Sequence, residues 1–168
     1  MNEVPWFERE LIFGKPVEML PYYLERLEGT IARLEKKVKG IDDAILSTRY
    51  NDKWSIKQNI GHLAEVDEIS NRRVDEMVKG ADILSPAVFE PQDYNPWPIE
   101  KVLEYFNRIR SVNIRKYQTL SESDFIKTSI HPRLKTKMSA VDLAWFDAEH
   151  DDHHLVRISE ILLLSKNQ

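Results

Sequence analysis

The feature that most constrains this chain is a run of apolar residues, near its start, spaced alternately four and three positions apart. Because an α-helix has 3.6 residues per turn, this spacing returns every apolar side chain to one face of a helix. A helix with one apolar stripe has to pack against partners, so the run predicts a helix of a bundle. Pro16 or Pro21 is expected in its first turn and Gly40 near its end. The run consists of Leu20, Leu24, Leu27, Ile31, Leu34, Val38 and Ile41.

Three further segments, 55–80, 98–120 and 139–164, have helical periodicity. The first begins with Ser55 three residues before Gln58, which fits a capping box, and the third begins with the same spacing of serine and aspartate. The second begins near a proline, a favoured first-turn residue. Their apolar faces consist of Ile56, Leu63, Val66, Ile69, Val74 and Met77, then Ile99, Leu103, Phe106, Ile109 and Leu120, and then Leu143, Ile158, Ile161 and Leu162.

The connections at 42–54, 81–97 and 121–138 contain no repeat and no convincing pair of strands. Segment 81–97 carries three prolines and is unusually long for a compact domain, as crossovers and lids over binding sites often are. A crossover there would allow the third helix to run parallel to the second. The sequence therefore predicts an all-α four-helix bundle, with a crossover between helices 2 and 3, as a single domain over residues 1–168.

The net charge, the cysteine content and the lack of long apolar stretches argue against several classes of function. The net charge of −4 argues against general nucleic-acid binding, because such domains are usually basic. The absence of cysteine excludes disulfides, thiolate zinc sites and a cysteine nucleophile. We expect no secretory signal, because the first residues mix acids with apolar residues, and no stretch approaches the roughly 20 apolar residues of a membrane span. We therefore expect a cytoplasmic protein with no membrane or nucleic-acid partner.

The stretch 148–154 reads AEHDDHH and holds three of the five histidines. On a helical wheel, His150 and His154 lie about 40° apart on the inward face. His153 lies about 60° to the other side, toward the polar rim. His62 is central on the apolar face of helix 2. The pattern predicts that three imidazoles from two helices point into the same interior.

Histidines four apart on a helix can hold one metal ion, and a third histidine from another helix adds a further ligand. Three neutral nitrogens suit zinc, nickel, iron(II) or copper, with open positions for water or substrate. The alternative for each residue is a hydrogen-bonded core histidine, and an isolated His-x-x-x-His pair also occurs by chance. His153 is expected at the surface and His131 in a loop, both outside the site.

Three other polar residues are candidates for the site. Asp147 lies one turn before His150 and is expected either to orient a ligand or act as a base, or to lie at the helix surface. Arg110 faces inward on helix 3, where it can bind an anionic substrate or pair structurally with an acid. Glu65 lies three residues after His62 but is expected to be exposed.

Trp145, Val156 and Leu163 form a stripe on the face of helix 4 opposite the histidines. If the bundle buries only one face of that helix, the stripe is a candidate subunit interface. Otherwise helix 4 packs on both sides.

Four short elements, taken together, are fairly specific. They are Lys53-Trp54-Ser55-Ile56 leading to Gly61-His62-Leu63-Ala64, then Asn107-Arg108-Ile109-Arg110, then His131-Pro132, and finally Glu149-His150-Asp151-Asp152-His153-His154-Leu155. In this order and at these separations the chain resembles the DinB-like family of metal-binding four-helix bundles, which includes bacillithiol S-transferase-type proteins.

The resemblance implies a divalent metal, nickel or zinc most often, held by His62, His150 and His154. It also implies frequent homodimers, and a small-molecule substrate, for instance a low-molecular-weight thiol. We therefore expect a metal-dependent enzyme that activates a thiol or water, of thiol transferase or hydrolase type. The alternatives are a non-catalytic bundle that binds a metal or small ligand, and a bundle in which the histidines only stabilise the fold.

Overall fold

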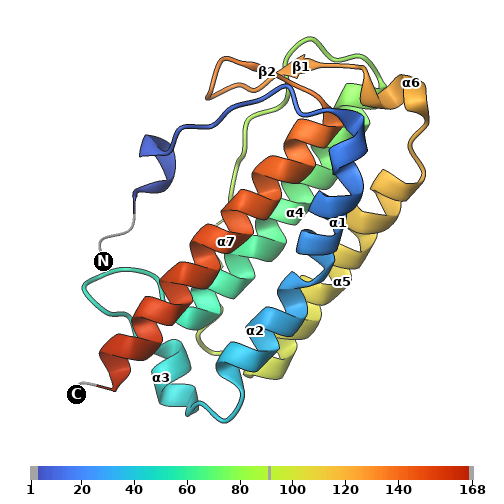
Figure 1. Ribbon diagram of the computed structural model, residues 1–168. Helices are drawn as coiled ribbons and strands as arrows, with labels where there is room; N and C mark the ends of the chain where they lie inside the picture. Colours follow the sequence, from blue (N-terminus) through green and yellow to red (C-terminus); the bar gives the residue numbers. More distant parts are fainter. Residues whose placement is uncertain (1–3, 91, 167–168) are drawn as a thin grey trace.

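The protein is a four-helix bundle in the computed structural model, which describes residues 4–90 and 92–166 (Figure 1). This confirms the predicted fold class. The helices are α1 (Leu20–Glu28), α2 (Thr30–Val38), α3 (Asp43–Ser47), α4 (Ile56–Val78), α5 (Ile99–Gln118), α6 (Glu122–Phe125) and α7 (Ala140–Ser165), with 3-10 turns η1 (Trp6–Glu8) and η2 (Val17–Met19) and strands β1 (Ser129–Ile130) and β2 (Lys137–Met138).

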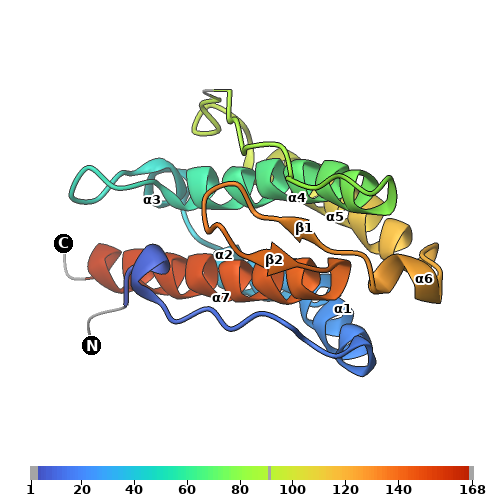
Figure 2. The ribbon, with the colours of Figure 1, turned by 90° about the horizontal axis from the view of Figure 1, so that it is seen from above.

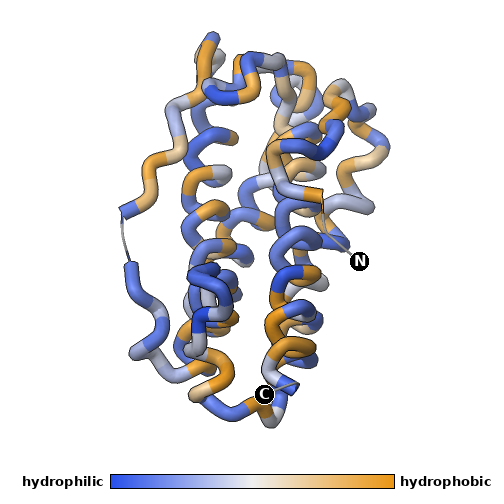
Figure 3. The backbone as a smooth tube through the Cα atoms, turned by 90° about the vertical axis from the view of Figure 1, so that its left-hand side faces the viewer, coloured by the Kyte–Doolittle hydropathy of each residue, from blue (hydrophilic) through white to orange (hydrophobic). Residues whose placement is uncertain are grey.

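The helices α4 and α5 run parallel, as the predicted crossover requires. Contacts between them advance in the same direction: Arg110 pairs with Asp67, and Lys116 pairs with Asp75 further along. The connecting segment therefore returns from one end of the bundle to the other along its outside (Figure 3). Helix α7 is antiparallel to α4 and parallel to the α1–α2 pair (Figure 1).

The first helix is divided, whereas the sequence predicted one helix over the whole apolar run. Gly29 separates α1 from α2 but keeps a helical conformation, with φ −70° and ψ −10°. The Arg33 N–H donates to the Gly29 carbonyl at 3.3 Å, so the two helices continue in nearly the same direction. The second ends at Val38, before Ile41, because Gly40 takes a left-handed φ of +72°.

Capping boxes start α4 and α7 as predicted. The Ser55 hydroxyl accepts from the Gln58 N–H while the Gln58 side chain accepts from the Ser55 N–H. Ser139 and Asp142 make the same reciprocal pair. These caps satisfy otherwise unpaired N–H groups and fix where each helix begins, and therefore which residues face the interior.

The connections contain short elements that the sequence did not reveal, so the prediction of no strand pair was wrong. Strands β1 and β2 pair antiparallel, and Ile83 of the crossover bridges to Ile130. The hairpin lies over one end of the bundle between α4 and α7 (Figure 2). Strands of two residues are too short to show an alternating pattern, and α3 and α6 are too short to show helical periodicity.

The core has two apolar layers with a polar layer between them. One contains Leu27, Val74, Tyr117 and Leu143, and the other contains Leu34, Leu63, Phe106 and Ile158. Between these levels the helices contribute buried polar side chains, among them Thr30, Asp67, Arg110, Asp151 and His154. The polar layer is where a site is expected, because buried polar groups are costly unless they are partnered.

No helix of the described residues is both long enough and apolar enough to cross a membrane.

Candidate metal centre

His62 of α4 meets His150 and His154 of α7 in the polar layer, as predicted. One ring nitrogen from each histidine lies within 4.8 Å of the other two. The ring centroids are 5.4 Å apart for His62 and His150, 5.1 Å for His62 and His154, and 4.5 Å for His150 and His154. We call these three residues the histidine triad.

Asn59 fixes the orientation of His154. The Asn59 Oδ1 lies 2.7 Å from His154 Nδ1, and the Asn59 amide in turn donates to the Ser55 carbonyl at 2.8 Å. The Asn59 oxygen is an acceptor, so His154 carries its proton on Nδ1. The His154 Nε2 therefore keeps its lone pair, and it faces His150 Nε2 at 3.2 Å. Asn59, one turn before His62, was not recognised from the sequence.

Glu65 and Tyr94 orient His62. Glu65 Oε2 lies 3.4 Å from His62 Nδ1, while Glu65 Oε1 accepts from the Tyr94 hydroxyl at 2.8 Å. The expectation that Glu65 is exposed was wrong, since its side chain is 19% exposed. Tyr94, from the crossover, closes over the carboxylate. The Tyr94 ring lies against Gly61, where an added Cβ would come within 2.3 Å of it.

The environment favours neutral imidazoles, the form that binds metals. Burial lowers the pKa of His150 and His154 well below the ordinary value, and the neighbouring histidines lower it further. His150 Nδ1 is also buried and has no hydrogen-bond partner within the described residues. Three imidazoles this close together, with the Nε2 atoms of His150 and His154 3.2 Å apart, fit a divalent ion of the zinc or nickel type.

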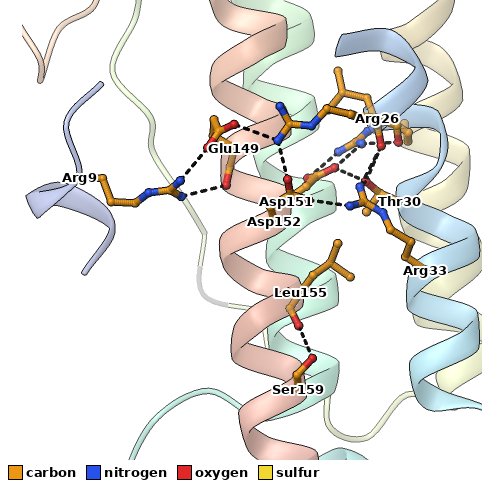
Figure 4. A network of polar contacts seen from close by, with 11 residues as sticks. Arg9, Arg26, Thr30, Arg33, Glu149, Asp151, Asp152, Leu155 and Ser159 are labelled. Carbon is orange, nitrogen blue, oxygen red and sulfur yellow. Dashed lines mark hydrogen bonds and ion pairs between the residues drawn. The ribbon is translucent and has the colours of Figure 1, made fainter. Parts of the chain in front are cut away.

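Two acids among the α7 histidines, Glu149 and Asp152, bind arginines of the N-terminal segment, α1 and α2 (Figure 4). Arg9 and Arg26 bind Glu149, with N–O distances of 2.7 and 2.9 Å. Arg26 and Arg33 bind Asp152 at 2.5 and 2.6 Å. The side chains of the stretch AEHDDHH therefore contact neighbours on two different faces of α7. Its acids bind α1, α2 and the N-terminal segment, while two of its histidines face α4.

Arg110 forms buried ion pairs. Of its two expected roles, binding an anionic substrate or pairing with an acid, the structure shows the second. Its guanidinium donates to Asp67 at 2.6 Å and to both oxygens of Asp151 at 2.6 and 3.0 Å. It is 3% exposed and does not line the cavity described below, so it presents no surface to a substrate. Asp151, which the sequence analysis did not consider, provides most of this pairing.

Asp147 is 2% exposed and hydrogen-bonds with Ser70, so it does not lie at the helix surface. Burial, together with the nearby charge of Asp67, raises its pKa to about 8. It does not line the cavity and makes no recorded contact with a triad histidine. Its role as an orienting residue or base stays a prediction.

A cavity of about 1070 Å³ opens beside the triad. Aromatic rings cover the histidines: Trp54 is 4.6 Å from His62 and Trp6 is 5.0 Å from His150, centroid to centroid. The crossover contributes to the cavity wall through Pro86–Ala87 and Phe89–Glu90, and the hairpin contributes through His131–Arg133. The two remaining histidines also line the cavity, which was not expected. His131 lies in the loop after β1, as predicted, but is only 6% exposed, and His153, predicted at the surface, is half-buried.

The predicted apolar stripe on α7, formed by Trp145, Val156 and Leu163, is covered by other residues at one end. Phe13 of the N-terminal segment packs edge-on against Trp145, with ring centroids 5.6 Å apart, and the Lys15 ammonium lies 4.2 Å from the same ring. Val156 and Leu163 are 50% and 62% exposed. The stripe is thus packed at Trp145 and open toward the C-terminal end of the helix.

Comparison with known proteins decides the family. The model of the DinB superfamily matches residues 26–158, most of the chain. This chain belongs to the DinB superfamily.

Among solved structures, YfiT from Bacillus subtilis has a similar fold, with a TM-score of 0.78 and 21% sequence identity over 91% of each chain. That protein is described as a probable metal-dependent hydrolase with an unusual four-helix bundle topology. A search of curated proteins found no match. The N-terminal segment of this DinB-superfamily chain, which includes Trp6, lies outside the matched residues.

Proposed function

We propose that this protein is a metal-dependent enzyme that holds a divalent ion, nickel or zinc, at His62, His150 and His154 and uses it to activate a water or a thiol. The observation that carries the proposal is the histidine triad at the wall of a large cavity. The description of YfiT as a probable metal-dependent hydrolase supports it. A bound divalent ion lowers the pKa of a coordinated water or thiol, which supplies a nucleophile at neutral pH.

The residues around the triad have distinct roles in this proposal. Asn59 and Glu65 hold the rings of His154 and His62 in the orientation that presents a lone pair, as partners of metal ligands commonly do. Trp6, Trp54 and Phe89 pack on the histidine rings and exclude bulk water. The substrate, a small molecule, enters beneath the crossover and the hairpin, whose residues form the cavity wall. Location in the cytoplasm stays a prediction from the sequence.

Metal content tests the site. Protein purified without an affinity tag is analysed by elemental mass spectrometry. We expect about one ion per chain in the unmodified protein, and loss of stoichiometric metal in each of His62→Ala, His150→Ala and His154→Ala. The matched control is His153→Ala, because His153 lines the same cavity from the same helix but is outside the triad. Unchanged metal content in all three triad variants would show that the site is assigned wrongly.

Turnover tests the catalytic part of the proposal. Metal-loaded protein is offered a panel of esters and amides, and in parallel low-molecular-weight thiols paired with electrophiles. We expect turnover of one class that disappears in the triad variants and persists in His153→Ala. If the loaded protein turns over none of the panel, the non-catalytic alternative of a metal- or ligand-binding bundle replaces the enzyme.

A further inference from the structure

The cavity has two chemically different ends. His62 and Arg73 both line it from α4. They are eleven residues apart, which places them on the same face of the helix and about 16 Å apart along its axis. Val66 and Ile69 line the cavity between them, and Phe146 faces them from α7. The triad is therefore at one end, a guanidinium is at the other, and an apolar wall connects them.

Arg73 is a buried cation without a paired counter-charge. It is 5% exposed, and its donors reach only neutral groups: they donate to the Ser85 carbonyl at 3.3 and 3.4 Å, and one of them lies against the His131 ring. No carboxylate among the described residues forms an ion pair with it. A buried charge without a paired partner is costly, so an anion bound here would be stabilised.

Two acids, Asp147 and Glu76, act on the Arg73 pKa through their charges and raise it, but neither forms an ion pair with the guanidinium. Glu76 accepts from the Ser85 N–H at 2.8 Å through one oxygen, and its other oxygen lies 3.6 Å from Arg72. Asp147 attracts Arg73 electrostatically, but burial raises the Asp147 pKa to about 8, so it is largely uncharged at neutral pH.

His131 cannot satisfy Arg73 either. Its Nδ1 lies 3.3 and 3.1 Å from the N–H groups of Arg133 and Leu134, so this nitrogen is the acceptor. A neutral imidazole has only one acceptor nitrogen, so its proton is on Nε2. Nε2 lies 3.2 Å from Arg73 Nη1, where two donors then face each other without an acceptor. Burial, together with the positive charges of Arg73 and Arg133, lowers the His131 pKa to about 4 and keeps the ring neutral.

We propose that Arg73 and His131 bind the carboxylate of the substrate, whose apolar part lies along Val66, Ile69 and Phe146 and whose reacting group reaches the histidine triad. A carboxylate has two oxygens with several lone pairs, which supply the acceptor that both side chains lack. Arg133, held over the Phe7 ring at 3.4 Å, adds a second positive charge at the same rim. The inference rests on the proposed function in that it takes this cavity as the substrate site.

The test compares octanoate with 1-octanol, two probes that share an alkyl chain and differ in the anionic head group. Binding to the full-length metal-loaded protein is measured by calorimetry, with the fluorescence of Trp6 and Trp54 in the cavity wall as a second readout. We expect the unmodified protein to prefer octanoate. Arg73→Gln should weaken octanoate binding on the order of 10- to 100-fold, the usual effect of losing a charge-assisted hydrogen bond, and leave octanol unchanged.

Arg72→Gln is the matched control, since Arg72 is the neighbouring arginine on α4 but is exposed and does not line the cavity. It should change neither affinity. Arg73→Lys keeps the charge without the planar fork and should retain part of the preference, which provides a second variant if Arg73→Gln does not fold. His150→Ala should keep the preference for octanoate, which separates this site from carboxylate binding to the metal.

Two results would overturn the proposal: equal binding of octanoate and octanol by the unmodified protein, or equal loss of octanoate binding in Arg72→Gln and Arg73→Gln. Tighter binding of octyl phosphate than of octanoate would replace the carboxylate with a phosphate ester. Failure of the proposed function is distinguishable, because it is measured by the metal content of the triad variants. A preference for octanoate that depends on Arg73 would stand without it.

Discussion

At the scale of single residues, neighbours in the sequence have unrelated roles because their directions differ. His150 and His154 face α4, whereas Asp151 and Asp152 between them bind Arg110 and Arg33. The partner atom also decides what each ring does. His154 Nδ1 is held by Asn59, so its Nε2 is the nitrogen available to a ligand. The residue type decides which donor and acceptor atoms a side chain has, and its hydrogen-bond partners decide which of these atoms stay available to a ligand.

Asp147 allows a prediction about pH. In the unfolded chain an aspartate ionises near pH 3.9. In the fold, burial raises the Asp147 pKa to about 8. Between about pH 4 and pH 8 the folded state therefore keeps a proton that the unfolded state has lost, and stability falls as pH rises through this window. Asp147→Asn removes the penalty. Its free energy of unfolding, relative to that of the unmodified protein, should increase from pH 4 to pH 8 in chemical denaturation.

The control for this measurement is Asp75→Asn on α4. The Asp75 side chain is 52% exposed, pairs with Lys116 and lacks the burial that causes the effect, so Asp75→Asn should show no rise in relative stability from pH 4 to pH 8. The absence of such a rise in Asp147→Asn would mean that Asp147 does not retain its proton in the fold.

At the scale of elements, α4 is the helix on which the site is built. Within two turns it carries Asn59, Gly61, His62 and Glu65. The Tyr94 ring of the crossover packs against α4 at Gly61, and the Tyr94 hydroxyl donates to Glu65. Gly61 lacks a side chain, so the ring can come close enough to reach this carboxylate. The helix and the crossover thus position His62 together.

Gly61→Ala tests this arrangement. The new Cβ would lie 2.3 to 2.5 Å from three atoms of the Tyr94 ring, so the ring has to move. We expect a loss of stability of about 1–3 kcal/mol, typical of overpacking, and weaker metal binding because Glu65 loses its partner. In a Tyr94→Ala background the same substitution should cost much less, which a double-mutant cycle by chemical denaturation would show. Equal costs in both backgrounds would point to another cause.

At the scale of the whole molecule, the parallel run of α4 and α5 decides where the cavity lies. The crossover has to return along the bundle, and on its way it packs Phe89 on His62 and binds Glu65 through the Tyr94 hydroxyl. The N-terminal segment lies along α7 on the other side, held by the Gly14 and Lys15 N–H groups on Asp142, and it places Trp6 over His150. Two segments without long helices, which run along the outside of α4 and α7 (Figure 2), therefore cover the triad with aromatic rings.

The predicted homodimer belongs to this scale as well. Val156 and Leu163 are exposed on α7, and we propose that they lie in the subunit interface. We expect light scattering coupled to gel filtration to give the mass of two chains, and Val156→Asp to reduce it toward one by burying a charge in the interface. Ile126→Asp, at a position 79% exposed near the other end of the bundle, should leave the mass unchanged. A single-chain mass for the unmodified protein would exclude the dimer.

The sequence by itself determined the bundle, the helix starts and the inward direction of three histidines, because these depend on local spacing. The period of 3.6 residues assigns each side chain to a face, and a capping box involves residues only three apart. The short strands, α3 and α6 escaped detection because they extend over too few residues for a period to appear.

Only the tertiary structure decided which polar groups meet. Arg110 takes Asp67 and Asp151 as partners, Glu65 turns to His62, and Arg73 and His131 come together from α4 and the hairpin. These contacts join residues that are far apart in the chain or that depend on a third residue such as Tyr94. Helical spacing gives the direction of a side chain from its own axis. What lies in that direction depends on how the helices and the crossover pack, and that is set by the burial of the whole apolar surface.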